Sequence, residues 1–308
     1  MKSFESLRIV FMGTPEFAVA SLDALVQAGC TIVGVVTAPD KPAGRGMKLT
    51  ESAVKKYAVE HGLPVLQPEK LKNPAFLDEL KALKADLQIV VAFRMLPELV
   101  WNMPPLGTVN LHGSLLPQYR GAAPINWAVI NGEKETGVTT FKLQHEIDTG
   151  NILLQEKFPI GENETAGEVH DKMKEIGAKV LVKTVKALAE DSIEEKPQQQ
   201  VSDLKHAPKI FTETCRIDFT QSNDKVHNLI RGLSPFPGAF TTLKEKTFKI
   251  YRSEKIAGTG DVKAGEWTSD YKTFLHFACG EGSIAVRELQ WEGKKRMTIE
   301  EFLRGFRP

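Results

Sequence analysis

The sequence predicts an α/β protein with two domains: a Rossmann-like, mostly parallel sheet at the N-terminus, then a smaller OB-like β-barrel. Residues 7–37 form the pattern strand, helix, strand, which implies a parallel sheet with a right-handed crossover. Residues 191–208 are polar, as is typical of an interdomain linker. From Lys209 onward, short strands are separated by turn residues, which indicates a small open barrel. We therefore expect domains over 1–190 and 209–308.

Length and composition describe an ordinary globular protein. A chain of 308 residues can bury two cores, and 42% hydrophobic with 26% charged residues is a usual balance. The net charge is +1, and residues 209–308 hold 17 Lys and Arg against 13 Asp and Glu, an excess too common to identify a partner alone. The three cysteines are widely spaced and no CxxC occurs, which gives zinc and redox motifs no support. With neither a signal-peptide pattern nor roughly eighteen consecutive apolar residues, we expect a cytoplasmic protein.

The elements of the first domain follow from apolar runs and their boundaries. Thr14 can cap the first helix, and Pro15 suits its first position. The apolar run at 86–93 is expected to be a strand buried on both faces. The expected strands are 7–13, 31–37, 64–67, 86–93, one beginning at Gly107, and an antiparallel pair at 135–143 and 152–159. The expected helices are 14–28, 51–61, 73–83, 123–131 and 166–190.

The second domain shows a different pattern. The expected strands are 216–219, 247–252, 273–278 and 284–291, with one helix at 222–233.

The first turn does not support dinucleotide binding. Gly13 is followed by Thr-Pro-Glu-Phe-Ala, so the second and third glycines of the fingerprint are missing. No acidic residue ends the second strand either. A nicotinamide-dependent oxidoreductase is therefore a disfavoured alternative at the level of the fold.

The stretch from Gly107 to Pro124 holds the candidate chemistry. Asn110 and His112 are two apart on a strand, so their side chains leave the same face. An amide beside an imidazole can hold a developing oxyanion and handle a proton. By residue type alone a single histidine is more often structural. Asp148, in an Asp-Thr-Gly turn between the antiparallel strands, is by the same standard a turn residue.

Ser114, which follows closely, lacks the Gly-x-Ser-x-Gly pattern of a nucleophile. Metal spacing is also absent around His112.

A basic segment follows the second strand. Lys41, Arg45 and Lys48 lie among two prolines and two glycines in a connection longer than the usual two to six residues. The plain interpretation is a solvated loop. However, ligands bind at the carboxyl ends of parallel strands, and a basic loop there suits a phosphate backbone.

The sequence resembles the signature of the formyltransferases that use 10-formyltetrahydrofolate. The matching residues are Asn-x-His-x-Ser-Leu-Leu-Pro-x-Tyr-Arg-Gly and, farther along the chain, Asp-Thr-Gly. The resemblance implies that Asn110, His112 and Asp148 are catalytic, with a carboxylate near His112 strengthening it as a hydrogen-bond donor. It implies folate as co-substrate and no metal. The matching folate-binding segment is Ser114, Leu115, Leu116 and Pro117.

The similarity covers most of the chain, and the basic segment matches the members that formylate methionyl-initiator tRNA for initiation of translation. In those members the loop meets the acceptor stem, which would give Lys41, Arg45 and Lys48 a tRNA-binding role. The aminoacylated initiator tRNA is then the expected partner. Two alternatives stay open: a formyltransferase acting on a small amine such as a ribonucleotide or nucleotide sugar, and an RNA-binding module with an inactive catalytic domain.

Overall fold

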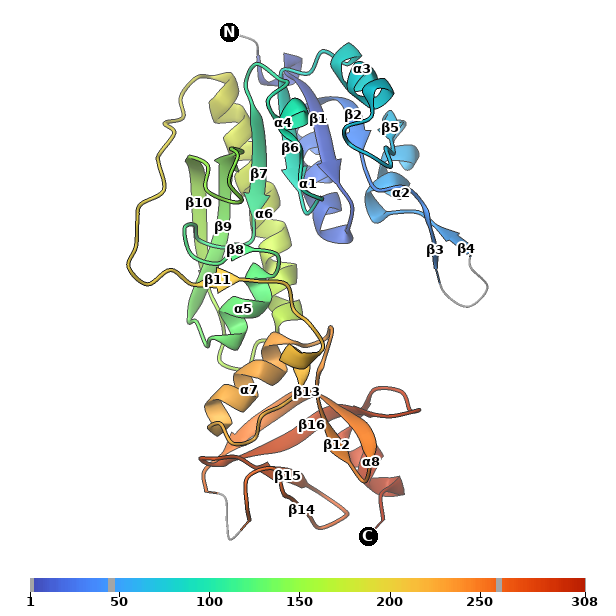
Figure 1. Cartoon of the computed structure of the whole chain (residues 1–308), viewed down its shortest axis with the longest axis vertical. Coiled ribbons are helices and arrows are strands. Elements are labelled where there is room, and N and C mark those ends of the chain that lie inside the picture. The colour runs from blue at the N-terminus through green and yellow to red at the C-terminus, as the bar shows by residue number, and fades with distance from the viewer. Residues whose placement is uncertain (1–2, 44–47, 259–261, 308) are drawn as a thin grey trace. The chain divides into compact units, whose positions relative to one another are not determined.

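The computed structural model describes residues 3–43, 48–258 and 262–307 (Figure 1). It divides into two compact units. The first comprises 1–120, 137–157 and 171–205, and the second comprises 121–136, 158–170 and 206–308. The chain therefore passes between the units more than once. The expected domain boundaries at 190 and 209 are a coarser division than this one and stay a prediction.

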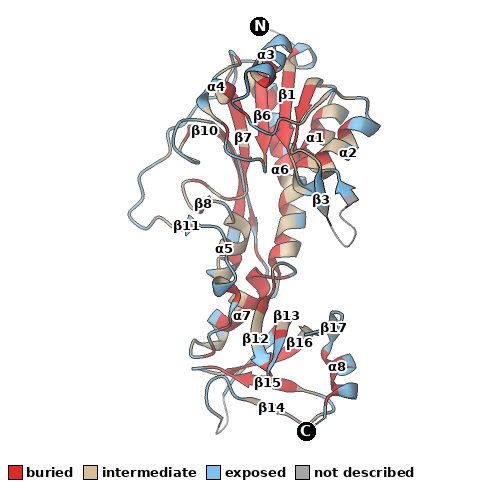
Figure 2. Cartoon of the chain, turned by 45° about the vertical axis from the view of Figure 1, so that its right-hand side comes forward, coloured by how far each residue is buried: buried red, intermediate tan, exposed pale blue. Residues whose placement is uncertain are grey.

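A seven-stranded sheet forms the centre of the first unit, in the order β10-β9-β7-β6-β1-β2-β5. Its strands are β1 (Arg8–Gly13), β2 (Thr31–Val36), β5 (Val65–Leu66), β6 (Leu87–Val91), β7 (Thr108–His112), β9 (Glu135–Lys142) and β10 (Ile152–Pro159). Pairing is parallel from β7 through β6, β1 and β2 to β5, and β9 runs antiparallel to β7. The expected Rossmann-like, mostly parallel sheet is confirmed. The central strands β1 and β6 are almost wholly buried, as their apolar sequences require (Figure 2).

Helices cover both faces of this sheet. These helices are α1 (Glu16–Gln27), α2 (Ala53–Glu60), α3 (Pro74–Ala82), α4 (Glu98–Trp101) and α6 (Ala166–Ala189), whereas α5 (Pro124–Ile130) belongs to the second unit. On one face, Val10 and Val90 share a core with Phe76 of α3 and Val100 of α4. On the other face α6 packs directly on β7: a Cβ at Gly177 would lie 3.0 Å from the Leu111 side chain. Side chains alternate along β7, so Asn110 and His112 project from the face opposite α6.

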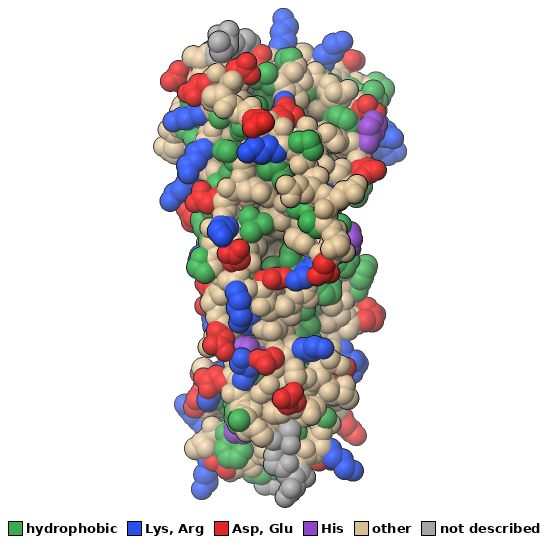
Figure 3. All heavy atoms as spheres, turned by 90° about the vertical axis from the view of Figure 1, so that its left-hand side faces the viewer, with side chains coloured by type: hydrophobic (Ala, Val, Ile, Leu, Met, Phe, Trp, Pro, Cys, Tyr) green, Lys and Arg blue, Asp and Glu red, His purple; other side chains and the backbone are tan. Residues whose placement is uncertain are grey.

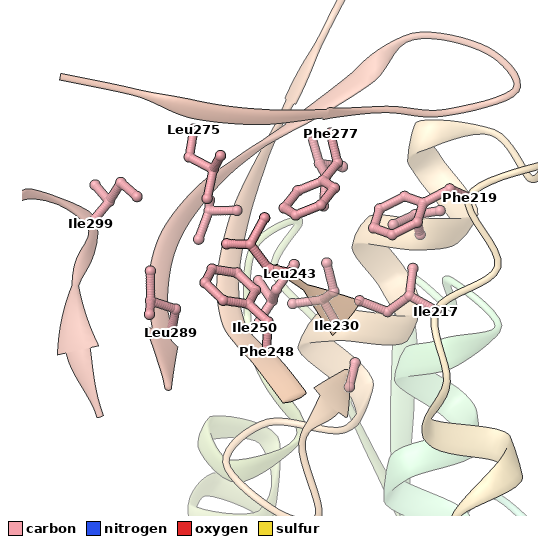
Figure 4. Close-up of a cluster of buried hydrophobic side chains, with 14 of the residues drawn as sticks. Ile217, Phe219, Ile230, Leu243, Phe248, Ile250, Leu275, Phe277, Leu289 and Ile299 are labelled. Carbon is pink, nitrogen blue, oxygen red and sulfur yellow. The ribbon is translucent and has the colours of Figure 1, made fainter. Parts of the chain in front are cut away.

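The second unit is built on a six-stranded antiparallel sheet, with β12-β13-β16-β15-β14 in order and β17 beside β16. Its elements are α7 (Asn223–Gly232), β12 (Ala239–Leu243), β13 (Lys246–Ile256), β14 (Trp267–Ser269), β15 (Leu275–Ala278), β16 (Ser283–Trp291), β17 (Met297–Thr298) and α8 (Ile299–Gly305). The long strand β13 has two register shifts against β16, which allow such a sheet to curl into a partly open barrel. Inside it, Phe277 stacks on Phe219 at 5.0 Å and faces Phe248 (Figure 4).

The remaining short elements are η1 (Phe4–Ser6), β3 (Lys41–Ala43), β4 (Lys48–Thr50), β8 (Arg120–Gly121), β11 (His206–Ala207) and η2 (Glu213–Cys215). β3 and β4 form a hairpin, and β8 and β11 form a two-stranded sheet.

Three expectations about local structure are wrong. The N-cap of α1 is Pro15 rather than Thr14, and no side chain caps this helix. Residues 216–219 make only a single bridge, Arg216 to Phe240, instead of a strand. The reason is local: Asp218 accepts hydrogen bonds from the backbone and hydroxyl of Thr220, which turns the chain away. We expect no strand in the basic segment, yet it begins and ends as the paired strands β3 and β4.

Candidate active site

Strand β7 presents Asn110 and His112 side by side because both lie on its face opposite α6. In the ladder with β9, His112 is opposite Thr139 and Asn110 is opposite Phe141. His112 is buried, whereas Asn110 is partly exposed. Within the described residues, the Asn110 side chain makes no hydrogen bond. Its amide is therefore available to a ligand that enters from solvent.

The two ring nitrogens of His112 have different surroundings. Nε2 lies 2.9 Å from the carbonyl oxygen of Tyr119, and a carbonyl can only accept, so Nε2 carries the hydrogen. Nδ1 lies 3.8 Å from Oδ2 of Asp148. That separation is too long for a direct hydrogen bond. Nδ1 is consequently the ring nitrogen without a hydrogen in the neutral imidazole, with Asp148 as its neighbour.

Asp148 reaches this position on a tight loop between β9 and β10, residues 143–151, which we call the Asp148 loop. Asp148 itself has a left-handed backbone, with φ of 55°, a conformation that Asp and Asn tolerate better than most residues. Gly150 is required sterically, because a Cβ there would lie 1.6 Å from the carbonyl oxygen of Lys142. At the other end, His145 pairs with Glu98 of α4 at 3.3 Å. The loop thus contacts the end of β9 on one side of Asp148 and α4 on the other.

In the predicted folate segment, buried residues alternate with partly exposed ones. Ser114 is fully buried and its hydroxyl donates to the carbonyl of Gln118 at 2.6 Å, so it is neither exposed nor available as a nucleophile. Thr139 braces the backbone: it donates to the carbonyl of Ser114 at 2.7 Å and accepts from the amide of Leu116 at 3.1 Å. The Leu115 side chain packs so closely on Gly137 that a Cβ there would lie 2.5 Å away. Pro117 and Leu115 are partly exposed at the turn.

The basic hairpin is held firmly at its base. Asp40 accepts hydrogen bonds from Lys55 at 2.6 Å and Gln67 at 2.7 Å, and the Lys55 bond is the main reason that the pKa of Asp40 lies below its usual value. Lys41 is exposed on β3. Arg45 lies outside the described residues, and of Lys48 the structure describes the backbone in β4. The predicted tRNA contacts of this hairpin therefore stay a prediction.

Three residues near the site escaped the sequence analysis. Tyr119 accepts from His112 through its backbone. Gln198 donates to the carbonyls of Asp148 and Gly150, and Arg120 donates to Gln198. Arg120 belongs to the Tyr-Arg-Gly motif, which was a usable signal. Gln198 is one of three consecutive glutamines, and nothing in the sequence distinguishes it from the other two.

The described residues form neither a metal-binding cluster nor a helix that could span a membrane. Over 3–43, 48–258 and 262–307, no three His, Cys, Asp or Glu side chains gather closely enough to hold a metal ion. In the same ranges, no helix has the length and apolar character needed to cross a membrane.

Comparisons with known proteins cover nearly the whole chain. Residues 7–185 match the family model described as formyl transferase, and residues 209–307 match the formyl transferase C-terminal domain. The methionyl-tRNA formyltransferase of Bacteroides fragilis is 53% identical, over 98% of this chain and 96% of that protein. The enzyme of the same name from Parabacteroides distasonis is 55% identical, over 98% and 97%. Among solved structures, an N-formyltransferase from Helicobacter canadensis, in complex with folinic acid and dTDP-3-aminofucose, is similar in fold. Its TM-score is 0.70 at 21% identity, over 91% of this chain and 98% of that one.

Proposed function

The chain belongs to the formyl transferase family, and from that premise we propose that it transfers a formyl group from 10-formyltetrahydrofolate to the α-amino group of methionyl-initiator tRNA. The observation that carries the proposal is the position of Asn110 and His112 on one face of β7, with Asp148 3.8 Å from His112. Identity above 50% to methionyl-tRNA formyltransferases over almost the whole chain supports this substrate over a small amine. The folinic acid bound to the Helicobacter canadensis neighbour supports a folate co-substrate.

The reaction needs a donor for an oxyanion and a carrier for a proton. The amine attacks the formyl carbon, a tetrahedral oxyanion forms, and the bond to N10 of the folate breaks as the carbonyl is restored. The amide of Asn110 is positioned to donate to the oxyanion. Such a donor contributes roughly two to three orders of magnitude in rate.

His112 has one nitrogen left for this chemistry. With Nε2–H donating to Tyr119, the neutral ring offers a lone pair at Nδ1. Nδ1 can therefore take the proton that the attacking amine loses, and the resulting imidazolium can donate to the oxyanion or return the proton to N10. Asp148, 3.8 Å from Nδ1, stabilises this positive charge.

For the folate we propose the turn formed by Ser114, Leu115, Leu116 and Pro117. The Ser114 hydroxyl already donates to Gln118, and Thr139 holds the backbone of Leu116. The co-substrate would therefore meet a rigid turn and its exposed edge, at Leu115 and Pro117, rather than the serine side chain. A rigid turn lowers the entropy that binding costs.

For the tRNA we propose two contact regions. One is the β3–β4 hairpin with Lys41, Arg45 and Lys48, placed beyond β2 where open α/β sheets bind ligands. The other is a hollow in the second unit that is lined by Phe211, Phe236 and Lys249.

The hollow has features that suit RNA. Phe236 is 82% exposed and Phe211 is 58% exposed, with the ammonium of Lys209 over the Phe211 ring at 5.7 Å. Exposed aromatic rings beside cations stack on bases and neutralise phosphates. Elsewhere, on the face drawn in Figure 3, cations and anions are interleaved. We therefore expect localised contacts rather than a uniformly basic surface.

Transfer of labelled formyl tests the proposal. The purified protein is given 10-formyltetrahydrofolate and, in separate reactions, methionyl-initiator tRNA, the deacylated tRNA, a ribonucleotide amine and an amino-sugar nucleotide. We expect label only on the aminoacylated tRNA. Label on a small amine with none on the tRNA would replace this function by the small-amine alternative, and tRNA binding with no transfer to any acceptor would indicate an inactive RNA-binding module.

A further inference from the structure

The segment after α6, expected to be a linker, is part of the first unit. Residues 194–205, which we call the strap, run beside β10 (Figure 1). Near the start of the strap, Lys196 and Ile152 exchange two backbone hydrogen bonds of 2.7 and 2.9 Å. At its end, the carbonyl of Lys205 accepts from the amide of Tyr119 at 2.7 Å. A freely solvated linker would make neither contact.

A charged contact adds to this attachment. Glu195 lies 2.5 Å from the ammonium of Lys142 and accepts from Asn151 at 3.2 Å. The hydrogen bond from Lys142 lowers the pKa of Glu195 below its usual value. Lys142 directly precedes the Asp148 loop, and Asn151 is its last residue. Glu195 therefore joins the strap to both ends of that loop.

Gln198 is the strap residue that reaches Asp148. Its Nε2 donates to the carbonyls of Asp148 at 2.7 Å and Gly150 at 2.9 Å. Its Oε1 accepts from Arg120, at 2.6 Å from Nη2 and 3.2 Å from Nε. Because carbonyls only accept and a guanidinium only donates, this set of partners leaves one possible orientation for the amide. The side chain thus links Arg120 to the backbone on both sides of Thr149.

The link constrains the two groups that surround His112. Asp148 has a left-handed backbone, and the bonds from Gln198 hold its carbonyl while the carboxylate faces Nδ1 of His112. Farther along, the strap holds the amide of Tyr119, whose carbonyl accepts from Nε2 of the same ring. Both neighbours of the imidazole therefore depend on one segment of chain.

We propose that Gln198, oriented by Arg120, is a positioning residue for the formyl transfer, which acts by fixing Asp148 relative to His112. The inference rests on the proposed function. Gln198 is not expected to touch either substrate. Its loss should therefore lower kcat and leave the KM for folate unchanged.

The test compares neighbouring glutamines. Gln198→Glu keeps the length of the side chain and an acceptor for Arg120 but removes the donor to Asp148 and Gly150. A misplacement of about 1 Å in an active site costs about a hundredfold, so we expect kcat to fall about ten- to a hundredfold. Gln198→Met removes the donor without adding charge and should show the same loss. Gln200→Glu is the matched control, because within the described residues Gln200 makes no side-chain hydrogen bond.

Two further measurements separate positioning from a general structural role. In an Asp148→Asn background, Gln198→Met should lower kcat by no more than about threefold, because residues that act through one another are not additive. Amide hydrogen exchange over residues 143–151 should accelerate in Gln198→Met at unchanged melting temperature, a readout that needs no turnover. Normal kcat in both Gln198 variants, an equal loss in Gln200→Glu, full additivity with Asp148→Asn, or unchanged exchange would each overturn the inference. An inactive wild-type protein would instead contradict the proposed function, and the exchange result would still report on the Gln198 link.

Discussion

Nε2 of His112 donates to the carbonyl of Tyr119 at 2.9 Å, which turns Nδ1 of the ring towards Asp148. This relationship assigns the tautomer of the neutral ring. It also leaves the lone pair of the neutral ring at Nδ1.

Loss of either group on β7 should abolish most catalysis. Asn110→Ala and His112→Ala should each lower kcat by at least about a hundredfold, because an oxyanion donor or a proton carrier is removed. Steady-state kinetics with methionyl-initiator tRNA measures the loss, and circular dichroism checks the fold. Asn102→Ala, at an exposed site, is the control and should be normal. Near-normal turnover in a folded Asn110 or His112 variant would show that the assignment is wrong.

Charge rather than shape should be the contribution of Asp148. Asparagine tolerates the left-handed backbone, so Asp148→Asn should keep the loop and folate binding but lose rate, because nothing then stabilises a positive imidazole. Rates are measured between pH 6 and 9 beside a folate titration. Asp191→Asn is matched, since Asp191 also has a positive φ, of 51°. Wild-type rates for Asp148→Asn across that range would be incompatible with the electrostatic role.

The hairpin should matter for tRNA and not for folate. Arg45→Ala should lower kcat/KM for tRNA by a factor that corresponds to about 1–3 kcal/mol of lost binding free energy, the contribution of one good bidentate contact. Lys48→Ala should act more mildly and mainly reduce the salt dependence. The measurement is kcat/KM at two salt concentrations beside a folate titration, with the exposed Lys81→Ala as control. If Arg45→Ala leaves tRNA kinetics unchanged, the hairpin is a solvated connection and the small-amine alternative reopens.

The exposed aromatic ring of the second unit should also contribute to tRNA use. Stacking of one base on an aromatic ring contributes about 1–3 kcal/mol of binding free energy. Phe236→Ala should therefore raise the KM for tRNA, by no more than the factor equivalent to that free energy. Because Phe236 is 82% exposed, the melting temperature should not change. Phe236→Tyr, which keeps a ring, should behave as wild type. An unaltered KM in Phe236→Ala would remove the hollow from the proposed tRNA contacts.

Acid should weaken the second unit through His227. This buried side chain contacts the Ser253 hydroxyl at 2.9 Å, and burial first, then the charge of Arg231, lowers its pKa below the ordinary 6.5. A lowered folded-state pKa means that the unfolded chain binds the proton more readily. The stability that neutral His227 contributes is therefore fully present above about pH 6.5. It is lost as the pH falls through the lower pKa of the folded state.

Thermal unfolding of the full chain at pH 7.5 and 5.5 tests this. His227→Gln removes the titrating group, so its melting temperature should fall less between the two pH values than that of the wild type. The exposed His206→Gln should retain the wild-type difference. Equal differences in wild type and His227→Gln would contradict the prediction.

The class of fold and the chemical groups of the candidate site can be predicted from the amino-acid sequence alone. Apolar runs of strand and helix length, in alternation, predict a parallel sheet, and the period of two along 108–112 already places Asn110 and His112 on one face. These are local properties, set by backbone geometry within a few residues. The same local logic failed where a side chain competed with the backbone, as at Asp218, and where pairing replaced a loop, as in the hairpin.

The contacts that hold the site in place depend on the folded arrangement of the chain. The partners of His112 come from separate positions in the chain: Tyr119 in the following turn, and Asp148 between two later strands. Gln198 and Gln200 are identical in type and nearly so in context, yet only Gln198 faces two carbonyls and a guanidinium. Hydrogen-bond partners far apart in sequence are brought together by sheet order and register, which depend on how the whole core packs. For that reason the residue types of a site can be predicted from a sequence, while the contacts that orient those residues cannot.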